Sequence, residues 1–139
     1  MRSLGKRAAT AAVIAVLATV AGCGGDGASA GAGSCTLSES VSGAGLLMIC
    51  EEGTGLSPAD LDQLRQSCML SGGLPDGGVQ ANAQFSAGPC SHVGALGGCR
   101  VTAGTMTVTI WYYTTGAGGL GPADIQTLCA QSGATFVPA

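Results

Sequence analysis

The stretch GLSPADLDQL at residues 55–64 recurs as GLGPADIQTL at residues 119–128, with six of ten positions identical. In both copies a proline stands at the first helical position, and an aspartate follows two residues later, as in a capping box. Both stretches therefore predict short helices. The repeat extends beyond them: an offset of 64 residues also relates Cys35 to Cys99, and an offset of 61 relates Cys68 to Cys129.

The residues before the second helix alternate as strand residues do. Residues 105–115 read TMTVTIWYYTT, in which β-branched and aromatic side chains recur with period two. Ala103-Gly104 suits a hairpin turn back to a short strand at residues 99–102. The first copy has matching strand signals at residues 35–39 and 46–52. Residues 35–73 and 99–139 are therefore interpreted as two copies of a hairpin followed by a helix, with chance similarity in a chain rich in glycine and alanine as the alternative.

Two such units side by side predict an α+β domain. We expect a four-stranded antiparallel sheet with two short helices on one face. The Gly-rich insert at residues 74–98 is expected to be mostly loop, with a weak strand signal at residues 79–85. The final ATFVPA can add a short edge strand, which is not counted among the four.

The beginning of the chain has the pattern of an export signal. MRSLGKR carries three of the five basic residues, and residues 8–22 form an uncharged, mostly small and apolar run. This run is shorter than the roughly 20 residues that a membrane-spanning helix needs. A signal anchor or a buried helix is the alternative interpretation.

The run ends in Val20-Ala21-Gly22-Cys23, which resembles the lipobox of bacterial lipoproteins. The resemblance implies that residues 1–22 are a signal peptide and that Cys23 carries lipid. It also implies a cell-envelope location, and glycine rather than aspartate at residue 24 favours the outer membrane over the inner. Several acyl chains anchor a protein stably, whereas one does so only marginally.

Composition divides the rest of the chain into a tether and a domain. Residues 23–34, the cysteine and GGDGASAGAGS, are expected to be a flexible tether, and residues 35–139 the folded domain. From residue 23 onward the chain has two basic residues, Arg65 and Arg100, against all eight acidic ones. Without a basic patch, nucleic acid is not an expected partner.

With Cys23 assigned to lipid, six of the seven cysteines remain, and an even set in an exported domain indicates disulfides. The sequence has no CxxC and one histidine, so we expect no metal site, redox pair or cofactor. Six cysteines allow 15 pairings. The repeat favours Cys35–Cys68 and Cys99–Cys129 as equivalent pairs, which leaves Cys50–Cys90.

Catalytic signals are weak. His92, the only histidine, follows Ser91 without a hydrolase motif. Glu51 and Glu52 would point to opposite faces of a strand and would not act together. We expect no enzyme, and a hydrolase ranks last among the functions considered.

The largest apolar side chains of the predicted sheet suggest a different kind of site. Trp111 and Tyr113 would lie on the face away from the helices and could bind a sugar or peptide if that face is uncovered. We favour the other interpretation, in which the insert or the carboxy-terminal segment covers them.

The pattern of cysteine-bearing hairpins, a helix with one cysteine, a "PC" loop and a strand with "YY" is similar to that of small cysteine-rich bacterial envelope lipoproteins. The resemblance implies no activity. We therefore expect a non-enzymatic, lipid-anchored envelope protein that displays a small interaction domain. A module that binds carbohydrate or peptide through Trp111 and Tyr113 is the alternative, and the partners considered are the membrane, an envelope protein and a glycan.

Overall fold

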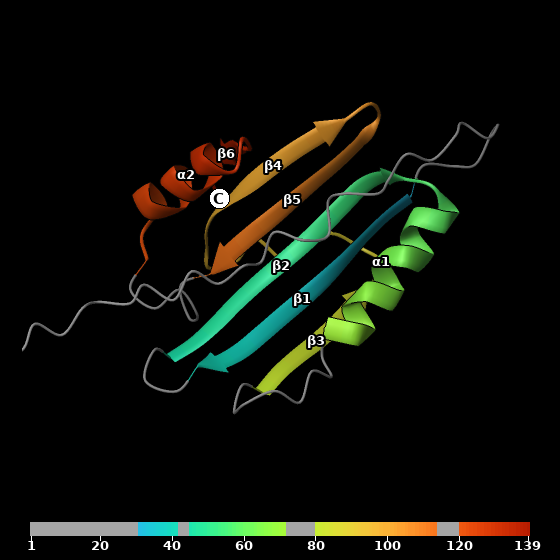
Figure 1. The fold of residues 1–139 in the computed structure, drawn as a ribbon, viewed down its shortest axis with the longest axis horizontal. Helices are drawn as coiled ribbons and strands as arrows, with labels where there is room; N and C mark the ends of the chain where they lie inside the picture. Colours follow the sequence, from blue (N-terminus) through green and yellow to red (C-terminus); the bar gives the residue numbers. More distant parts are fainter. Residues whose placement is uncertain (1–30, 42–44, 72–79, 114–119) are drawn as a thin grey trace, which may run out of the picture.

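The computed structural model of the chain describes residues 31–41, 45–71, 80–113 and 120–139 (Figure 1). Residues 1–22, which were expected to form a signal peptide, and Cys23 lie outside these residues. Two helices and six strands follow one another in the described part: β1 Gly31–Val41, β2 Gly45–Leu56, α1 Pro58–Ser71, β3 Gln80–Ser86, β4 Ala95–Ala103, β5 Met106–Tyr113, α2 Pro122–Gln131 and β6 Thr135–Val137.

The described strands form one antiparallel sheet of six, in the order β3-β1-β2-β5-β4-β6. The expectation of an α+β domain with two helices and three disulfides is confirmed, but the expected four strands are wrong. The two additional strands are the edges, β3 and β6. β3 is polar at most positions and β6 has three residues, so neither carries the apolar alternation that marks the central strands.

When the edge strands are included, each copy of the internal repeat has one more strand than the repeat predicted from the sequence. Each copy is strand–strand–helix–strand: β1-β2-α1-β3, then β4-β5-α2-β6. The third strand of each unit pairs with the first, and the units meet where β2 pairs with β5. From either edge toward this seam, the sheet therefore has the same order: the third, the first and then the second strand of a unit. Residues 80–86, expected in the insert, are the third strand of the first unit.

Both helices cover the same face of the sheet. Directly paired residues share a face, and one row of pairs runs from Cys35 through Glu51 and Ile110 to Cys99. Cys35 is bonded to Cys68 of α1. Cys99 is bonded to Cys129 of α2. Both helices therefore lie on the side of the sheet to which this row points. Figure 1 shows α1 over β1 and β3, and α2 over β4 and β6. We call this side the helix face and the other the opposite face.

Equivalent phenylalanines extend this row at both edges. Phe85 of β3 pairs with Cys35, and Phe136 of β6 pairs with Cys99. These are the only two phenylalanines of the chain. In the second unit Phe136 packs against the fully buried Ile125 and the Cys99–Cys129 disulfide. Each edge strand thus closes one side of a small core that its own helix covers.

The first strand begins earlier than composition suggests. Residues 31–34 were expected in the tether, but they belong to β1, and Ser34 is only 2% exposed. A Cβ at Gly33 would lie 2.8 Å from Cδ2 of Leu61 in α1. The glycines let the helix approach the strand closely. In the sequence, the same run of small residues has the composition of a flexible linker.

The helix starts follow the repeated stretch. The amide of Asp60 donates to Oγ of Ser57 (3.2 Å), and the amide of Ser57 donates to Oδ2 of Asp60 (3.0 Å), which is a reciprocal capping box. In α2 the amide of Gly121 donates to Oδ2 of Asp124 (2.7 Å), which forms half of that arrangement. Among the described residues no helix is long and apolar enough to cross a membrane.

Candidate functional site

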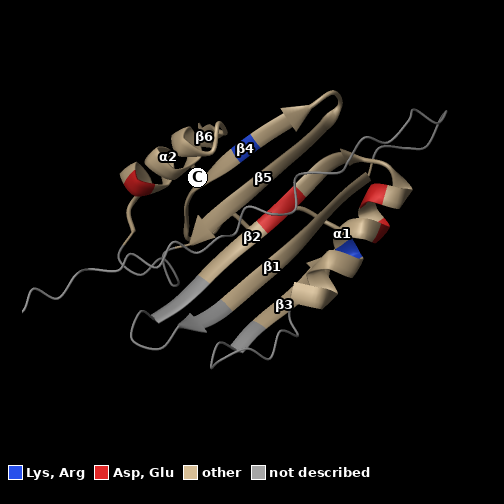
Figure 2. Ribbon diagram, viewed as in Figure 1, with Lys and Arg blue, Asp and Glu red and all other residues tan. Residues whose placement is uncertain are grey.

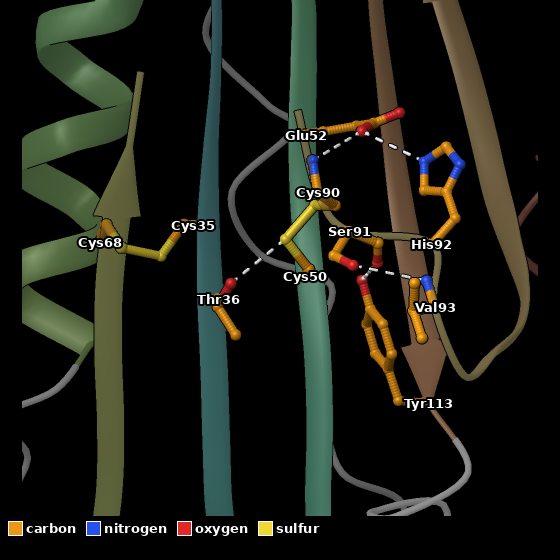
Figure 3. The surroundings of a disulfide bond; sticks show 10 residues. All are labelled: Cys35, Thr36, Cys50, Glu52, Cys68, Cys90, Ser91, His92, Val93 and Tyr113. Carbon is orange, nitrogen blue, oxygen red and sulfur yellow. Dashed lines mark hydrogen bonds and ion pairs between the residues drawn. A yellow bond between two sulfur atoms is a disulfide. The ribbon is translucent and has the colours of Figure 1, made fainter. Parts of the chain in front are cut away.

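Trp111 and Tyr113 lie on the opposite face, as the alternation of β5 predicts, but they are not exposed. Their exposed fractions are 2% and 4%. The favoured interpretation, that the insert covers this face, is therefore confirmed, because residues 87–94, between β3 and β4, cover both side chains. Tyr113 Oη donates a short hydrogen bond to the Ser91 carbonyl oxygen (2.6 Å; Figure 3). The His92 ring lies on the indole of Trp111.

The covering segment is attached to the sheet by a disulfide. The three disulfides of the structure join Cys35 to Cys68, Cys99 to Cys129 and Cys50 to Cys90, the same pairs that the repeat favours. Cys50 is the neighbour of Trp111 across β2 and β5. The Cys50–Cys90 bond therefore fixes the segment beside the tryptophan, and both sulfurs join Trp111 and Tyr113 in one buried cluster.

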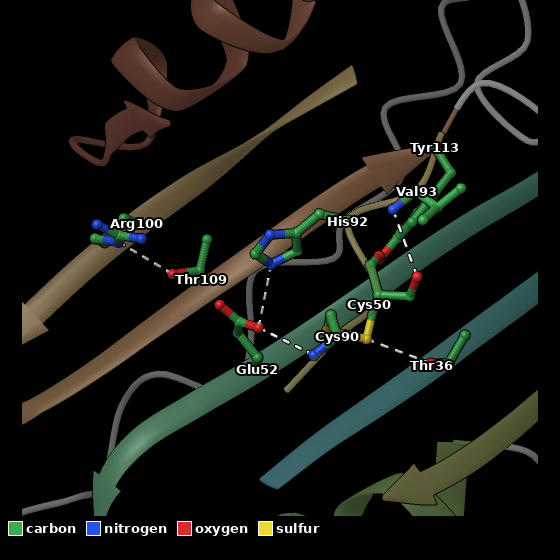
Figure 4. Close-up of polar contacts among 10 residues, drawn as sticks. Thr36, Cys50, Glu52, Cys90, His92, Val93, Arg100, Thr109 and Tyr113 are labelled. Carbon is green, nitrogen blue, oxygen red and sulfur yellow. Dashed lines mark hydrogen bonds and ion pairs between the residues drawn. A yellow bond between two sulfur atoms is a disulfide. The ribbon is translucent and has the colours of Figure 1, made fainter. Parts of the chain in front are cut away.

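Glu52 is the buried charge of this site. It lies on β2 on the opposite face and is 8% exposed. Its Oε2 accepts a hydrogen bond from the amide of Cys90 (3.0 Å) and lies 3.7 Å from Nε2 of His92 (Figure 4). The first contact is a hydrogen bond, whereas the second is longer than a hydrogen bond. The carboxylate thus helps to hold the covering segment.

His92 stacks on the tryptophan while half of its side chain stays in solvent. The centroids of the two rings are 4.1 Å apart, the planes are tilted by 35°, and the histidine side chain is 51% exposed. The imidazole is therefore an accessible ring that lies on a buried one and faces a buried carboxylate.

The tryptophan itself lies over a glycine. Gly98 of β4 pairs with Trp111, and a Cβ there would come within 3.1 Å of the indole atoms Cδ2 and Cε3. The missing side chain makes room for the ring on the sheet. Within the described part of the chain, the indole Nε1 is buried and has no hydrogen-bond partner. Such a donor costs free energy and calls for a physical explanation.

Burial and the nearby carboxylate both act on the tyrosine. Burial of Tyr113 raises the pKa of its phenol, and the negative charge of Glu52 raises it further. The phenol therefore stays protonated and keeps donating to the segment above it. On the same face, Arg100 of the neighbouring strand β4 donates from Nε to Oγ1 of the buried Thr109 (3.3 Å).

Glu51 and Glu52 point to opposite faces. Glu51 pairs with Cys35 and Ile110, so its carboxylate lies on the helix face. Burial raises the pKa of Glu51. Figure 2 shows the acidic middle of β2 apart from the acidic residues at the start of the helices. The two carboxylates cannot act on one substrate atom from these positions.

Sequence reasoning assigned no role to His92 or Glu52, and the structure brings both to Trp111. The sequence does contain an indication of this position. Cys90 stands two residues before His92, so a disulfide from Cys90 to Cys50 on the predicted sheet places the histidine close to that sheet. No cluster of three or more potential metal ligands occurs among the residues that the structure describes.

Comparisons with known proteins add no assignment to this site. No protein-family model, no curated protein and no solved structure matches the chain.

Proposed function

We propose that this is a lipid-anchored, non-enzymatic protein of the bacterial cell envelope, which displays its disulfide-bonded domain to a partner. The observation that carries the proposal is the pairing of the cysteines. Six of the seven form three disulfides, which leaves Cys23 as the one outside them. That cysteine ends a charged and then apolar run that resembles a lipoprotein signal peptide.

The disulfides also support an oxidising compartment, because such bonds are rare in the reducing cytosol. Lipid on Cys23 would attach the domain to the membrane, and Gly24 favours the outer membrane over the inner. The acidic composition after residue 23 supports an envelope protein or a glycan as partner and not a nucleic acid.

The proposed tether is shorter than composition indicated. β1 starts at Gly31, so seven residues, 24–30, separate it from Cys23. A Gly-rich coil of that length spans about 15 Å. The beginning of β1 would then lie near the membrane, and the far ends of β1 and β5 would point away from it.

The absence of enzymatic activity is proposed from the site geometry. Ser91 is the hydroxyl nearest in sequence to His92, and its Oγ accepts a hydrogen bond from the amide of Val93 (3.4 Å). His92 is directed toward Trp111 and Glu52 instead. A nucleophilic serine requires its hydroxyl within hydrogen-bond reach of a base. Because Trp111 and Tyr113 are covered, they give no support to an open sugar-binding platform.

Intact mass of the protein isolated from membranes tests the proposal. We expect a mass that corresponds to a chain starting at Cys23 plus acyl groups, and an increase of six hydrogens on reduction of three disulfides. The Cys23→Ser variant should lose the lipid and leave the membrane fraction, with its disulfides intact. A wild-type protein with an unmodified Cys23 thiol would refute the lipid anchor.

A further inference from the structure

We propose that Trp111 and Glu52 form a binding site for the guanidinium group of an arginine on a partner protein, and that His92 occupies this site in the structure. The inference extends the proposed interaction role by naming what the domain binds. It does not depend on lipid at Cys23, so the intact-mass experiment and the binding experiment below can fail independently.

The first step is the position of His92. Its imidazole lies on the indole of Trp111 with centroids 4.1 Å apart, and Nε2 faces Glu52 Oε2 at 3.7 Å. A flat ring with N–H groups thus already lies between an aromatic face and a carboxylate. It is held loosely, because the charge contact exceeds hydrogen-bond length and half of the side chain is in solvent.

The second step is the unused hydrogen-bonding capacity beside that ring. A carboxylate can accept about four hydrogen bonds. Glu52 is 8% exposed and receives one from the Cys90 amide, while the histidine contact is too long to be a second. Trp111 is 2% exposed, and its buried Nε1 has no partner among the described residues. The spare acceptor capacity of the buried Glu52 carboxylate is what a further N–H donor can use, whereas the indole Nε1 is itself a donor and gains no partner from a guanidinium.

The third step is the chemistry of the occupant. A guanidinium is planar, always charged and weakly hydrated, and it stacks on tryptophan. Its fork of five N–H donors can bond a carboxylate at two points, which an imidazole cannot. From residue 23 onward the chain has eight acidic residues and two basic ones, so a positively charged group is electrostatically complementary to the domain. A neutral sugar would gain stacking but would leave the charge of Glu52 unpaired.

The fourth step is how the site becomes vacant. Cys90 is bonded to Cys50 and also donates its amide to Glu52, so the backbone two residues before His92 is fixed. In this proposal, rotation of the histidine side chain toward solvent frees the part of the indole face that the imidazole covers, while the disulfide keeps the segment in place. The arginine therefore competes with one side chain, and removal of that side chain should increase its affinity.

Trp111 is the only tryptophan, so intrinsic fluorescence reports on this site alone. The experiment titrates the purified disulfide-bonded protein and its His92→Ala variant with N-acetyl-arginine amide. The matched control ligand is N-acetyl-citrulline amide, which has the same shape without the charge, and a methyl glycoside is the sugar control. We expect saturable fluorescence change with arginine only, with about tenfold tighter binding by His92→Ala than by wild type.

A second variant tests the carboxylate. Glu52→Gln in the His92→Ala background should abolish the arginine response while circular dichroism shows an unchanged fold. If that variant does not fold, the arginine and citrulline ligands on His92→Ala still decide the question. Equal responses to arginine and citrulline, no response to arginine by folded His92→Ala, or a response to the glycoside alone would overturn the proposal.

Discussion

Removal of the Cys50–Cys90 disulfide, in the variant Cys50→Ala/Cys90→Ala, should destabilise the domain and uncover its tryptophan. The bond closes a loop of 40 residues, which in the chain-entropy model corresponds to about 3.9 kcal/mol of stability. The Cys99–Cys129 loop of 30 residues corresponds to about 3.6 kcal/mol. The two losses are nearly equal, so Cys99→Ala/Cys129→Ala is a matched control.

The variants should differ in what happens to Trp111 before global unfolding. Without Cys50–Cys90, the covering segment keeps only contacts such as the Tyr113 hydrogen bond to Ser91, worth about 1 kcal/mol each. Local opening should become frequent, and acrylamide should quench the native-state fluorescence more strongly than in wild type. The control bond lies on the helix face, so its loss should leave native-state quenching unchanged.

The assay combines urea unfolding followed by circular dichroism with acrylamide quenching in the native baseline. Equal quenching of the two variants would refute the conclusion that the disulfide holds the segment over Trp111. A free energy of unfolding that changes by less than about 1 kcal/mol in the first variant would refute the loop-closure estimate.

Three further changes test the packing, the buried carboxylate and the helix start. Gly55→Ala should cost about 1–3 kcal/mol of unfolding free energy, because Gly55 has a φ of +71° and its Cβ would meet the backbone carbonyl of Thr105, whereas Gly88→Ala, with its nearest neighbour at 3.9 Å, should be nearly neutral in thermal melts. Burial raises the pKa of Glu51 above 4.5, so the folded state holds the proton more tightly and stability falls as pH rises from that value through the folded pKa. Glu51→Gln should therefore raise the melting temperature at neutral pH and have no effect well below pH 4.5; a gain that persists in acid would contradict this cause. Ser57→Ala removes the cap of α1 and should cost about 1 kcal/mol in urea unfolding, and an unchanged midpoint would show that the cap contributes little.

The sequence could predict the centre of the fold because the centre is repeated. The stretch at residues 55–64 and its copy located both helices, and the offset between copies favoured the disulfide pairs that the structure contains. The edge strands were not counted because their stability comes from pairing with β1 and β4. Residues 80–86 are mostly polar, and β6 places one large residue, Phe136, against its helix.

One error, at residues 31–34, and one question left between alternatives, the cover over Trp111, both arise from contacts between distant residues. Residues 31–34 resemble a linker, but their glycines are required where α1 crosses the strand. Trp111 resembles an exposed aromatic residue because its cover depends on a disulfide to Cys90 and on the Ser91 carbonyl. Neither contact leaves a periodic pattern in the sequence.

The interleaved disulfides of the first unit have a consequence for how the protein matures. Among Cys35, Cys50, Cys68 and Cys90, the first bonds with the third and the second with the fourth. As a chain emerges from its amino terminus, Cys50 is the first thiol that Cys35 can meet, and that bond is not native. If the Cys35–Cys50 bond forms first, it must be replaced by thiol–disulfide exchange through a mixed intermediate before the native set is complete. In the second unit Cys99 and Cys129 are consecutive and can pair directly. The amino-terminal half should therefore be the half that needs a disulfide isomerase.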